Sequence, residues 1–253
     1  TTSAQNCCMT PEQIESAVTD KTKAIIINSP SNPTGTIYET EALRQIAEIA
    51  VKHRCYVISD EIYESLLYDG LKHQSLASFN EEVKAITFVV NGVSKAYAMT
   101  GWRIGYTAGP ENAIAAMSRI QDHSTSNPTS IAQRAAVAAL TGPQAEVEKM
   151  RQAFEERRNA IAQRFDEIEG VTYVKPQGAF YIFPDVSAHY GRTIKGRTIN
   201  GSMDLTAYLL EEAGVGVVPG DGFGADGHIR LSFATSLKEI HRGLDRIKKA
   251  LER

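Results

Sequence analysis

Several features that define other protein classes are scarce in this chain of 253 residues. Its three cysteines, Cys7, Cys8 and Cys55, give neither an even disulfide framework nor a Cys-x-x-Cys metal-binding spacing. Lysine and arginine total 27 against 30 aspartate and glutamate residues, so no basic surplus indicates nucleic-acid binding. The apolar runs are too short to span a membrane, and no signal peptide opens the chain. We therefore expect a globular protein in a reduced, cytoplasmic setting, without a nucleic-acid or membrane partner.

The first half alternates between short apolar runs and helical patterns. The runs at residues 24–28, 55–59 and 85–90 predict buried strands, and the run at 104–108 predicts a fourth strand that could be antiparallel. Residues 40–52 have the three- and four-residue apolar spacing of an amphipathic helix. This alternation is typical of parallel strands joined by crossover helices. We therefore predict an α/β fold.

A second helix of this half is indicated by its capping residues. Thr10 can cap the helix, Pro11 suits its first turn, and Gln13 can close a capping box.

The second half changes character near Gly142 and Pro143, after an alanine-rich helix expected at residues 130–140. A long helix follows and is expected to end at Gly170. We then expect a helix from Asp204, a final helix capped by Ser236 and Glu239, and strands at 171–174, 179–183, 214–218 and 228–233. This pattern predicts two domains, 1–142 as part of a large domain and 143–253 as a small α+β domain.

Lys95 is the first candidate for chemistry, because it lies among glycines and hydroxyl residues in the run 91–106. A lysine between a strand and a loop is usually a solvated surface residue. A lysine amine that is kept partly neutral can instead form a Schiff base with a carbonyl cofactor. The neighbouring motifs decide between these two interpretations.

Three further residues stand where a ligand could bind. Asn32 follows the first strand in the loop 29–35, although Asn-Pro also forms plain turns. Asp60 ends the second strand and could also be a helix cap. Arg230 lies inside an apolar strand, where burying a guanidinium is costly unless it meets an anion. An internal ion pair is the alternative explanation for Arg230.

These motifs, in this order, resemble the aspartate aminotransferase family, the class I/II pyridoxal-phosphate-dependent aminotransferases of fold-type I. The motifs run from residue 29 to residue 234, and the resemblance covers essentially the whole chain. It implies part of a fold-type I large domain of mostly parallel sheet followed by the small domain. It implies that Lys95 carries pyridoxal 5'-phosphate as a Schiff base. It also implies that Asp60 keeps the pyridine nitrogen protonated and that Tyr63 hydrogen-bonds the ring oxygen.

The resemblance implies roles for four more residues. Arg103 would bind the cofactor phosphate, with Ser94 as a weaker contact. Asn32 would contact the cofactor and lie near the substrate carboxylate, and Arg230 would bind that carboxylate with both arms of its guanidinium. Gly92 departs from the family pattern, in which a hydroxyl residue often stands three positions before the lysine.

The expected function is therefore pyridoxal-phosphate-dependent transamination in amino-acid metabolism. An L-amino acid, aspartate-like or aromatic, would give its amino group through the Lys95 aldimine to a 2-oxo acid such as 2-oxoglutarate, by a ping-pong mechanism in a homodimer. The family's N-terminal portion, with part of its phosphate site, is not recognised in this sequence. A C–S lyase of the same fold, or a catalytically silent fragment or assembly subunit, therefore stays open as an alternative, and no metal site is expected.

Overall fold

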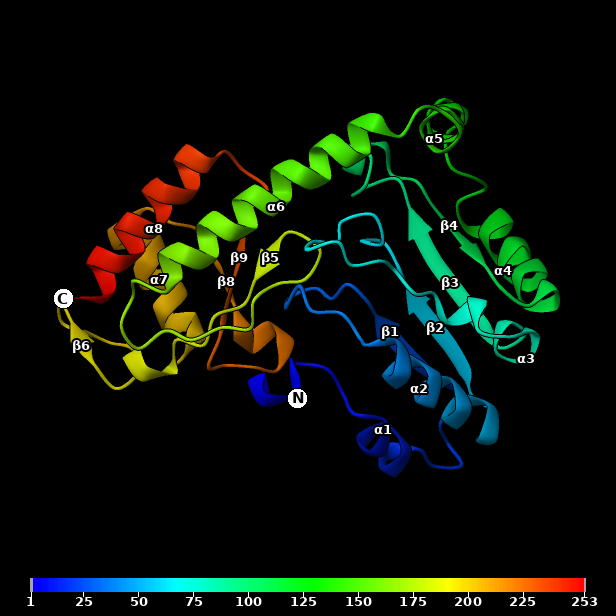
Figure 1. Ribbon diagram of the computed structural model, residues 1–253, viewed down its shortest axis with the longest axis horizontal. Helices are drawn as coiled ribbons and strands as arrows, with labels where there is room; N and C mark the ends of the chain where they lie inside the picture. Colours follow the sequence, from blue (N-terminus) through cyan, green and yellow to red (C-terminus); the bar gives the residue numbers. More distant parts are fainter. Residues whose placement is uncertain (1, 253) are drawn as a thin grey trace. The chain divides into compact units, whose positions relative to one another are not determined.

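A computed structural model describes residues 2–252, which form two compact units (Figure 1). The first unit comprises Cys8–Pro30 and Ile37–Met150. The second comprises Thr2–Cys7, Ser31–Thr36 and the chain from Arg151 onward. Along the sequence, the units meet within helix α6 (Ala145–Phe165), whereas the domain division after residue 142 remains a proposal.

The first unit contains a four-stranded sheet in the order β1-β2-β3-β4. β1 (Ala24–Asn28), β2 (Tyr56–Asp60) and β3 (Thr87–Gly92) are parallel, and β4 (Gly105–Ala108) is antiparallel to β3. This confirms the predicted α/β fold with a mainly parallel sheet. In this register Asn28 pairs with Asp60, and Asp60 pairs with Val90, so three strands end near one another.

Five α-helices belong wholly to the first unit: α1 (Pro11–Ala17), α2 (Thr40–Lys52), α3 (Glu81–Lys84), α4 (Glu111–Ser124) and α5 (Ser130–Thr141). The predicted capping box is present at α1, where the Thr10 side chain accepts from the Gln13 amide and the Gln13 side chain accepts from the Thr10 amide. Short 3₁₀ helices lie at Leu76–Ser78 and Thr100–Trp102. Helix α4 was not anticipated from the sequence.

The two faces of this sheet differ in burial. Ile25, Ile27 and Val57 pack in a core with Leu43 and Ile46 of α2. On the opposite face, Ile26 is 64% exposed and Tyr56 is 44% exposed. Because successive strand residues point to opposite faces, helices on one side bury only every second residue. The expectation of fully buried strands is therefore wrong for this opposite face in the described residues.

The second unit is built around a small antiparallel sheet in the order β5-β9-β8, formed by Tyr181–Ile182, Ile229–Ser232 and Val218–Pro219. A hairpin pairs β6 (Thr193–Ile194) with β7 (Arg197–Thr198). Helices α7 (Ser202–Ala213) and α8 (Leu237–Leu251) follow. Short 3₁₀ helices lie at Ser3–Gln5, Ser187–His189 and Gly220–Phe223.

Some boundaries expected in the second half are wrong. Residues 171–174 form no strand, only an isolated bridge between Thr172 and Asp185. The long helix ends at Phe165, short of Gly170. The Ser236 side chain does cap α8 by accepting from the Glu239 amide. None of the helices within residues 2–252 is both long and apolar enough to cross a membrane.

Candidate active site

Asp60, Tyr63 and Lys95 come together beyond the ends of β2 and β3. Asp60 is the last residue of β2, and Lys95 lies three residues after β3 ends. Tyr63, in the turn after β2, is 3% exposed, and the Lys95 Nζ atom lies 5.9 Å from the centre of its ring. Ligands of open parallel sheets bind beyond the carboxyl ends of strands, which is where these three residues lie.

The half-buried position of the Asp60 carboxyl group disfavours its charged form. Burial raises the pKa of Asp60, and the nearby Glu61 charge raises it further. The Ile62 amide donates to it at 3.3 Å, and Lys95 exerts a smaller, opposing attraction. Within residues 2–252 no lysine, arginine or histidine forms an ion pair with Asp60. A half-buried anion in this position suits a cationic ligand atom.

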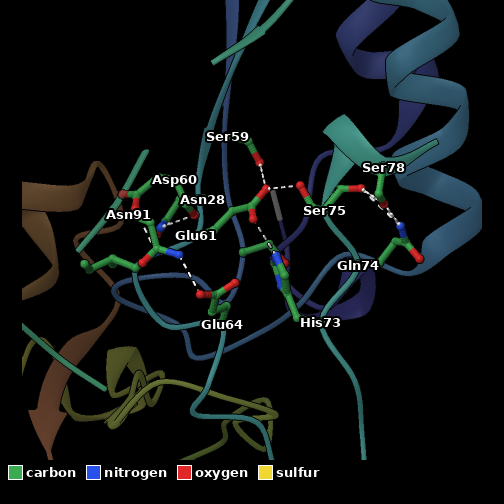
Figure 2. Close-up of polar contacts among 12 residues, drawn as sticks. Asn28, Ser59, Asp60, Glu61, Glu64, His73, Gln74, Ser75, Ser78 and Asn91 are labelled. Carbon is green, nitrogen blue, oxygen red and sulfur yellow. Dashed lines mark hydrogen bonds and ion pairs between the residues drawn. The ribbon is translucent and has the colours of Figure 1, made fainter. Parts of the chain in front are cut away.

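Glu61 points away from Asp60 and forms the centre of a buried hydrogen-bond network (Figure 2). Its carboxylate accepts from Ser59 Oγ at 2.8 Å and from Ser75 Oγ at 2.7 Å, and lies 2.9 Å from His73 Nε2. Burial alone raises the pKa of Glu61, but these hydrogen bonds outweigh burial, so its pKa is lowered. The network connects the end of β2 to the loop that contains His73 and Ser75. It therefore stabilises the backbone around Asp60.

Asn91 also stabilises the turn that contains Tyr63, through a hydrogen bond to Glu64. Its Nδ2 atom donates to Glu64 Oε1 at 2.7 Å, and its Oδ1 atom accepts from the Gly92 amide at 2.7 Å. Figure 2 shows Asn91 and Glu64 beside Asp60 and Glu61. Sequence reasoning missed His73, Ser75 and Asn91, because no residue spacing indicates hydrogen bonds that cross between loops.

Ser94 and Arg103 are linked through Thr100. Thr100 Oγ1 donates to the Ser94 carbonyl at 3.0 Å, and Arg103 Nη1 donates to the Thr100 carbonyl at 3.0 Å. No carboxylate within the described part of the chain pairs with Arg103, so its other guanidinium donors can face an anion. Trp102, in the same 3₁₀ turn as Thr100, is 45% exposed.

Gly92 has a structural reason to lack a side chain. A Cβ atom at this position would lie 3.1 Å from Gly105 Cα, 3.2 Å from the Ile104 carbonyl oxygen and 3.3 Å from the Ile62 side chain. The hydroxyl residue that the family often has here would therefore crowd the antiparallel strand β4.

Arg230 and Asn32 meet in the second unit, although they lie far apart in the sequence. Arg230 Nη1 donates to Asn32 Oδ1 at 2.8 Å. The guanidinium carbon lies 4.5 Å from the centre of the Tyr181 ring and 5.3 Å from that of Phe223, which hold its plane by cation–π contact. No carboxylate within residues 2–252 forms an ion pair with Arg230. The internal ion pair considered as an alternative is thus not found in the described residues.

The predicted site residues fall into two groups. Asp60, Tyr63, Ser94, Lys95 and Arg103 lie in the first unit, and Asn32 and Arg230 lie in the second. Each group offers a different chemistry: an amine, a carboxylate and a phenol in the first, and an amide with a stacked guanidinium in the second.

Comparison with known proteins agrees with this fold. Residues 1–247 match the sequence profile of the family described as aminotransferase class I and II. The chain therefore belongs to this family of fold-type I transferases.

Several individual members of this family are similar to the chain in sequence and in structure. The chain is 54% identical over 245 residues to an aspartate aminotransferase of Geobacillus stearothermophilus, which covers 96% of this chain and 61% of the relative. The crystal structure of the aspartate aminotransferase from Rhizobium meliloti superposes with a TM-score of 0.94 at 41% identity, covering 99% of this chain and 63% of that one. An aspartate aminotransferase from Thermus thermophilus with maleate has a TM-score of 0.90 at 41% identity, with 99% and 62% covered. The chain thus spans about 60% of the length of the relatives it matches.

Proposed function

We propose that this protein is a pyridoxal-phosphate-dependent aminotransferase that moves an amino group from an aspartate-like or aromatic L-amino acid to a 2-oxo acid. The observation that carries the proposal is the grouping of Lys95, Asp60 and Tyr63 beyond the strand ends, in a chain of the class I and II family.

The donor set of the first unit fits pyridoxal phosphate. Asp60 is a half-buried carboxylate without a cationic partner in the described residues, which suits a protonated ring nitrogen. Arg103 has donors that no carboxylate occupies, and the Ser94 hydroxyl lies in the loop linked to it by Thr100, which together suit a phosphate. When bound, the cofactor supplies a reactive carbonyl and a ring that accepts electrons.

Each residue of this group has a distinct task in the proposed reaction. Lys95 would hold the cofactor through its amine and would move a proton to and from the substrate α-carbon. Asp60 would keep the ring nitrogen protonated, and the Tyr63 hydroxyl would donate a hydrogen bond to the ring oxygen.

Arg230 and Asn32 are proposed to bind the substrate. The Arg230 guanidinium, in cation–π contact with Tyr181 and Phe223, presents a planar fork of donors that matches an α-carboxylate. Asn32 holds one arm of the guanidinium and so fixes its orientation. The maleate named with the Thermus relative makes a dicarboxylate a reasonable probe for this chain.

A single-turnover experiment tests the proposal. The protein is loaded with pyridoxal phosphate, mixed with L-aspartate or an aromatic amino acid, and analysed for conversion of the cofactor to its amino form together with release of the 2-oxo acid. Lys95→Ala should abolish this conversion, whereas Lys84→Ala, which removes an exposed lysine of α3, should not. Release of ammonia without formation of the amino form would favour a lyase, and no uptake of cofactor would favour a silent subunit.

A homodimer and a cytoplasmic location are also proposed. Cys7, Cys8 and Cys55 are all free thiols, which suits a reducing compartment. Sedimentation of the purified protein over a range of concentrations tests the dimer.

A further inference from the structure

Arg158 of α6 is a charged residue with no exposed surface. Its Nη1 atom donates to the Pro176 carbonyl at 2.7 Å, and its Nη2 atom lies 3.8 Å from a Glu155 carboxylate oxygen. Burying a guanidinium completely is unfavourable unless it is paired and hydrogen-bonded. The hydrogen bond to the Pro176 carbonyl connects Arg158 to the loop before β5.

The loop at residues 176–178 is hydrogen-bonded to a second loop of the same unit, which contains Gly35. The amides of Gln177 and Gly178 both donate to the Gly35 carbonyl at 2.8 Å. Gly35 has a φ of +69°, and a Cβ atom there would lie 2.6 Å from Pro176 Cβ and 2.8 Å from the Tyr181 carbonyl oxygen. The two loops are therefore in contact so close that a movement of Pro176 must move Gly35.

Gly35 in turn shapes the loop that carries Asn32. Its amide donates to the Ser31 carbonyl at 2.9 Å, and the Ser31 amide donates to the Thr36 carbonyl at 2.9 Å, which closes the loop around Asn32. Asn32 then meets Arg230 at 2.8 Å. Hydrogen bonds, linked through residues that are adjacent in the chain, thus connect α6 to the guanidinium of Arg230.

We propose that Arg158 is a positioning residue for the substrate-carboxylate site, acting on the Asn32–Arg230 pair through the Pro176–Gly178 backbone. The proposal rests on the assignment of Arg230 to the substrate carboxylate made above. The route from Arg158 to this pair runs from the Pro176 carbonyl through the Gln177 and Gly178 amides to Gly35, and from there to the loop that carries Asn32.

Binding of maleate to the cofactor-loaded protein, measured by calorimetry, tests the proposal. Arg158→Met should weaken maleate binding roughly tenfold to a hundredfold, as expected when a remote substitution misplaces a binding group by about 1 Å. Arg158→Lys keeps a donor for the Pro176 carbonyl and should restore part of the affinity. In steady-state assays Arg158→Met should raise KM more than it lowers kcat. The absorbance spectrum of the bound cofactor should stay unchanged.

Arg164→Met is the matched control. Arg164 lies on the same helix and pairs with Glu167 and Asp245, away from the Pro176 loop. Its loss should leave maleate affinity at the wild-type value. The proposal would be overturned if Arg164→Met weakened maleate binding as much as Arg158→Met does. It would also be overturned if a folded Arg158→Met protein bound maleate with wild-type affinity.

Amide hydrogen exchange separates this inference from the proposed function. Exchange at Gly35, Gln177 and Gly178 should accelerate in Arg158→Met but not in Arg164→Met, whether or not maleate binds. If the wild type fails to bind maleate, the assignment of Arg230 to the substrate carboxylate is wrong. If amide exchange at Gly35, Gln177 and Gly178 is unchanged in Arg158→Met, the positioning role of Arg158 is wrong as well. Should Arg158→Met not fold, Arg158→Lys and Gly35→Ala alter two different points of the same route. Normal maleate binding by both variants would contradict the inference.

Discussion

Asp60 and Glu61 are adjacent carboxylates whose pKa values are shifted in opposite directions. Burial raises the pKa of Asp60, which accepts one backbone amide hydrogen bond. Burial also acts on Glu61, but hydrogen bonds from His73, Ser75 and Ser59 lower its pKa overall. The Glu61 carboxylate is thus satisfied within the fold by its hydrogen bonds, while the Asp60 carboxylate is left for a ligand.

Asp60→Asn should therefore separate activity from stability. A carboxyl group with a raised pKa in the folded state disfavours folding once it ionises, so this penalty is present above the folded pKa and absent below the unfolded value of 3.8. We expect the variant, without cofactor, to melt higher than wild type at pH 7 and equally at pH 3. Transamination should fall by about a hundredfold or more. Calorimetry at both pH values and single-turnover assays measure the two effects; a variant that is less stable at pH 7 would contradict this account.

Arg230→Lys should impair substrate binding without harming the fold. Lysine keeps the charge but loses the planar fork, and no ion pair within the described residues is broken. Loss of one charged hydrogen bond, about 1.5–3 kcal/mol, predicts a roughly tenfold to hundredfold drop in kcat/KM for every amino donor. Melting temperature and cofactor binding should barely change. A large fall in melting temperature with normal kinetics would instead make Arg230 structural.

At the scale of the element, the Glu61 network connects β2 to the loop after it. Because the folded pKa of Glu61 lies below its unfolded value of 4.5, the ionised carboxylate stabilises the fold above that value, and this contribution is lost as pH falls through the folded pKa. Glu61→Gln should lower stability at pH 7 by about 1–3 kcal/mol, with the difference shrinking in acid. Urea denaturation at pH 7 and pH 3.5 measures this. Glu82→Gln, on the exposed start of α3, is the control and should change little.

The elements that were predicted well are those with long periodic patterns and distinct caps. Helix α2 has the predicted bounds, and α1 has its capping box, because both signals are local in the sequence. The strands of the second unit are only two to four residues long, too short for alternation to define their ends. Helix α4 buries none of its residues in the described structure, so no clean apolar stripe marked it.

The candidate site was predictable to the extent that it consists of motifs. Lys95 and Asp60 stand out because an amine and a carboxylate follow apolar strands. His73 could not be found, since its contact with Glu61 depends on how a loop folds back. Arg158 could not be found either, because a basic residue in a charged helix is ordinarily read as part of a solvated face.

At the scale of the whole molecule, the first unit carries an apolar sheet face that the described residues leave uncovered around Ile26 and Tyr56. Contiguous exposed apolar surface binds hydrophobic dyes and promotes association. We expect a protein of these 253 residues to enhance the fluorescence of anilinonaphthalene sulfonate, and Ile26→Ser to reduce the enhancement. Met203→Ser, which removes a side chain that is 59% exposed on α7, should leave it unchanged. Equal fluorescence from all three proteins would show that this face binds no dye.

The packing around Gly35 also restricts how this protein can evolve. Every amino acid other than glycine would place a Cβ atom against Pro176 and the Tyr181 backbone, so no single substitution at position 35 leaves the loop as it is. Replacing residue 176 would remove only one of these contacts, because the Tyr181 and Gly178 carbonyl oxygens at 2.8 and 2.9 Å belong to the backbone. An alignment of homologues should therefore show glycine at this position, and frequent replacement of Gly35 would contradict the close contact described here.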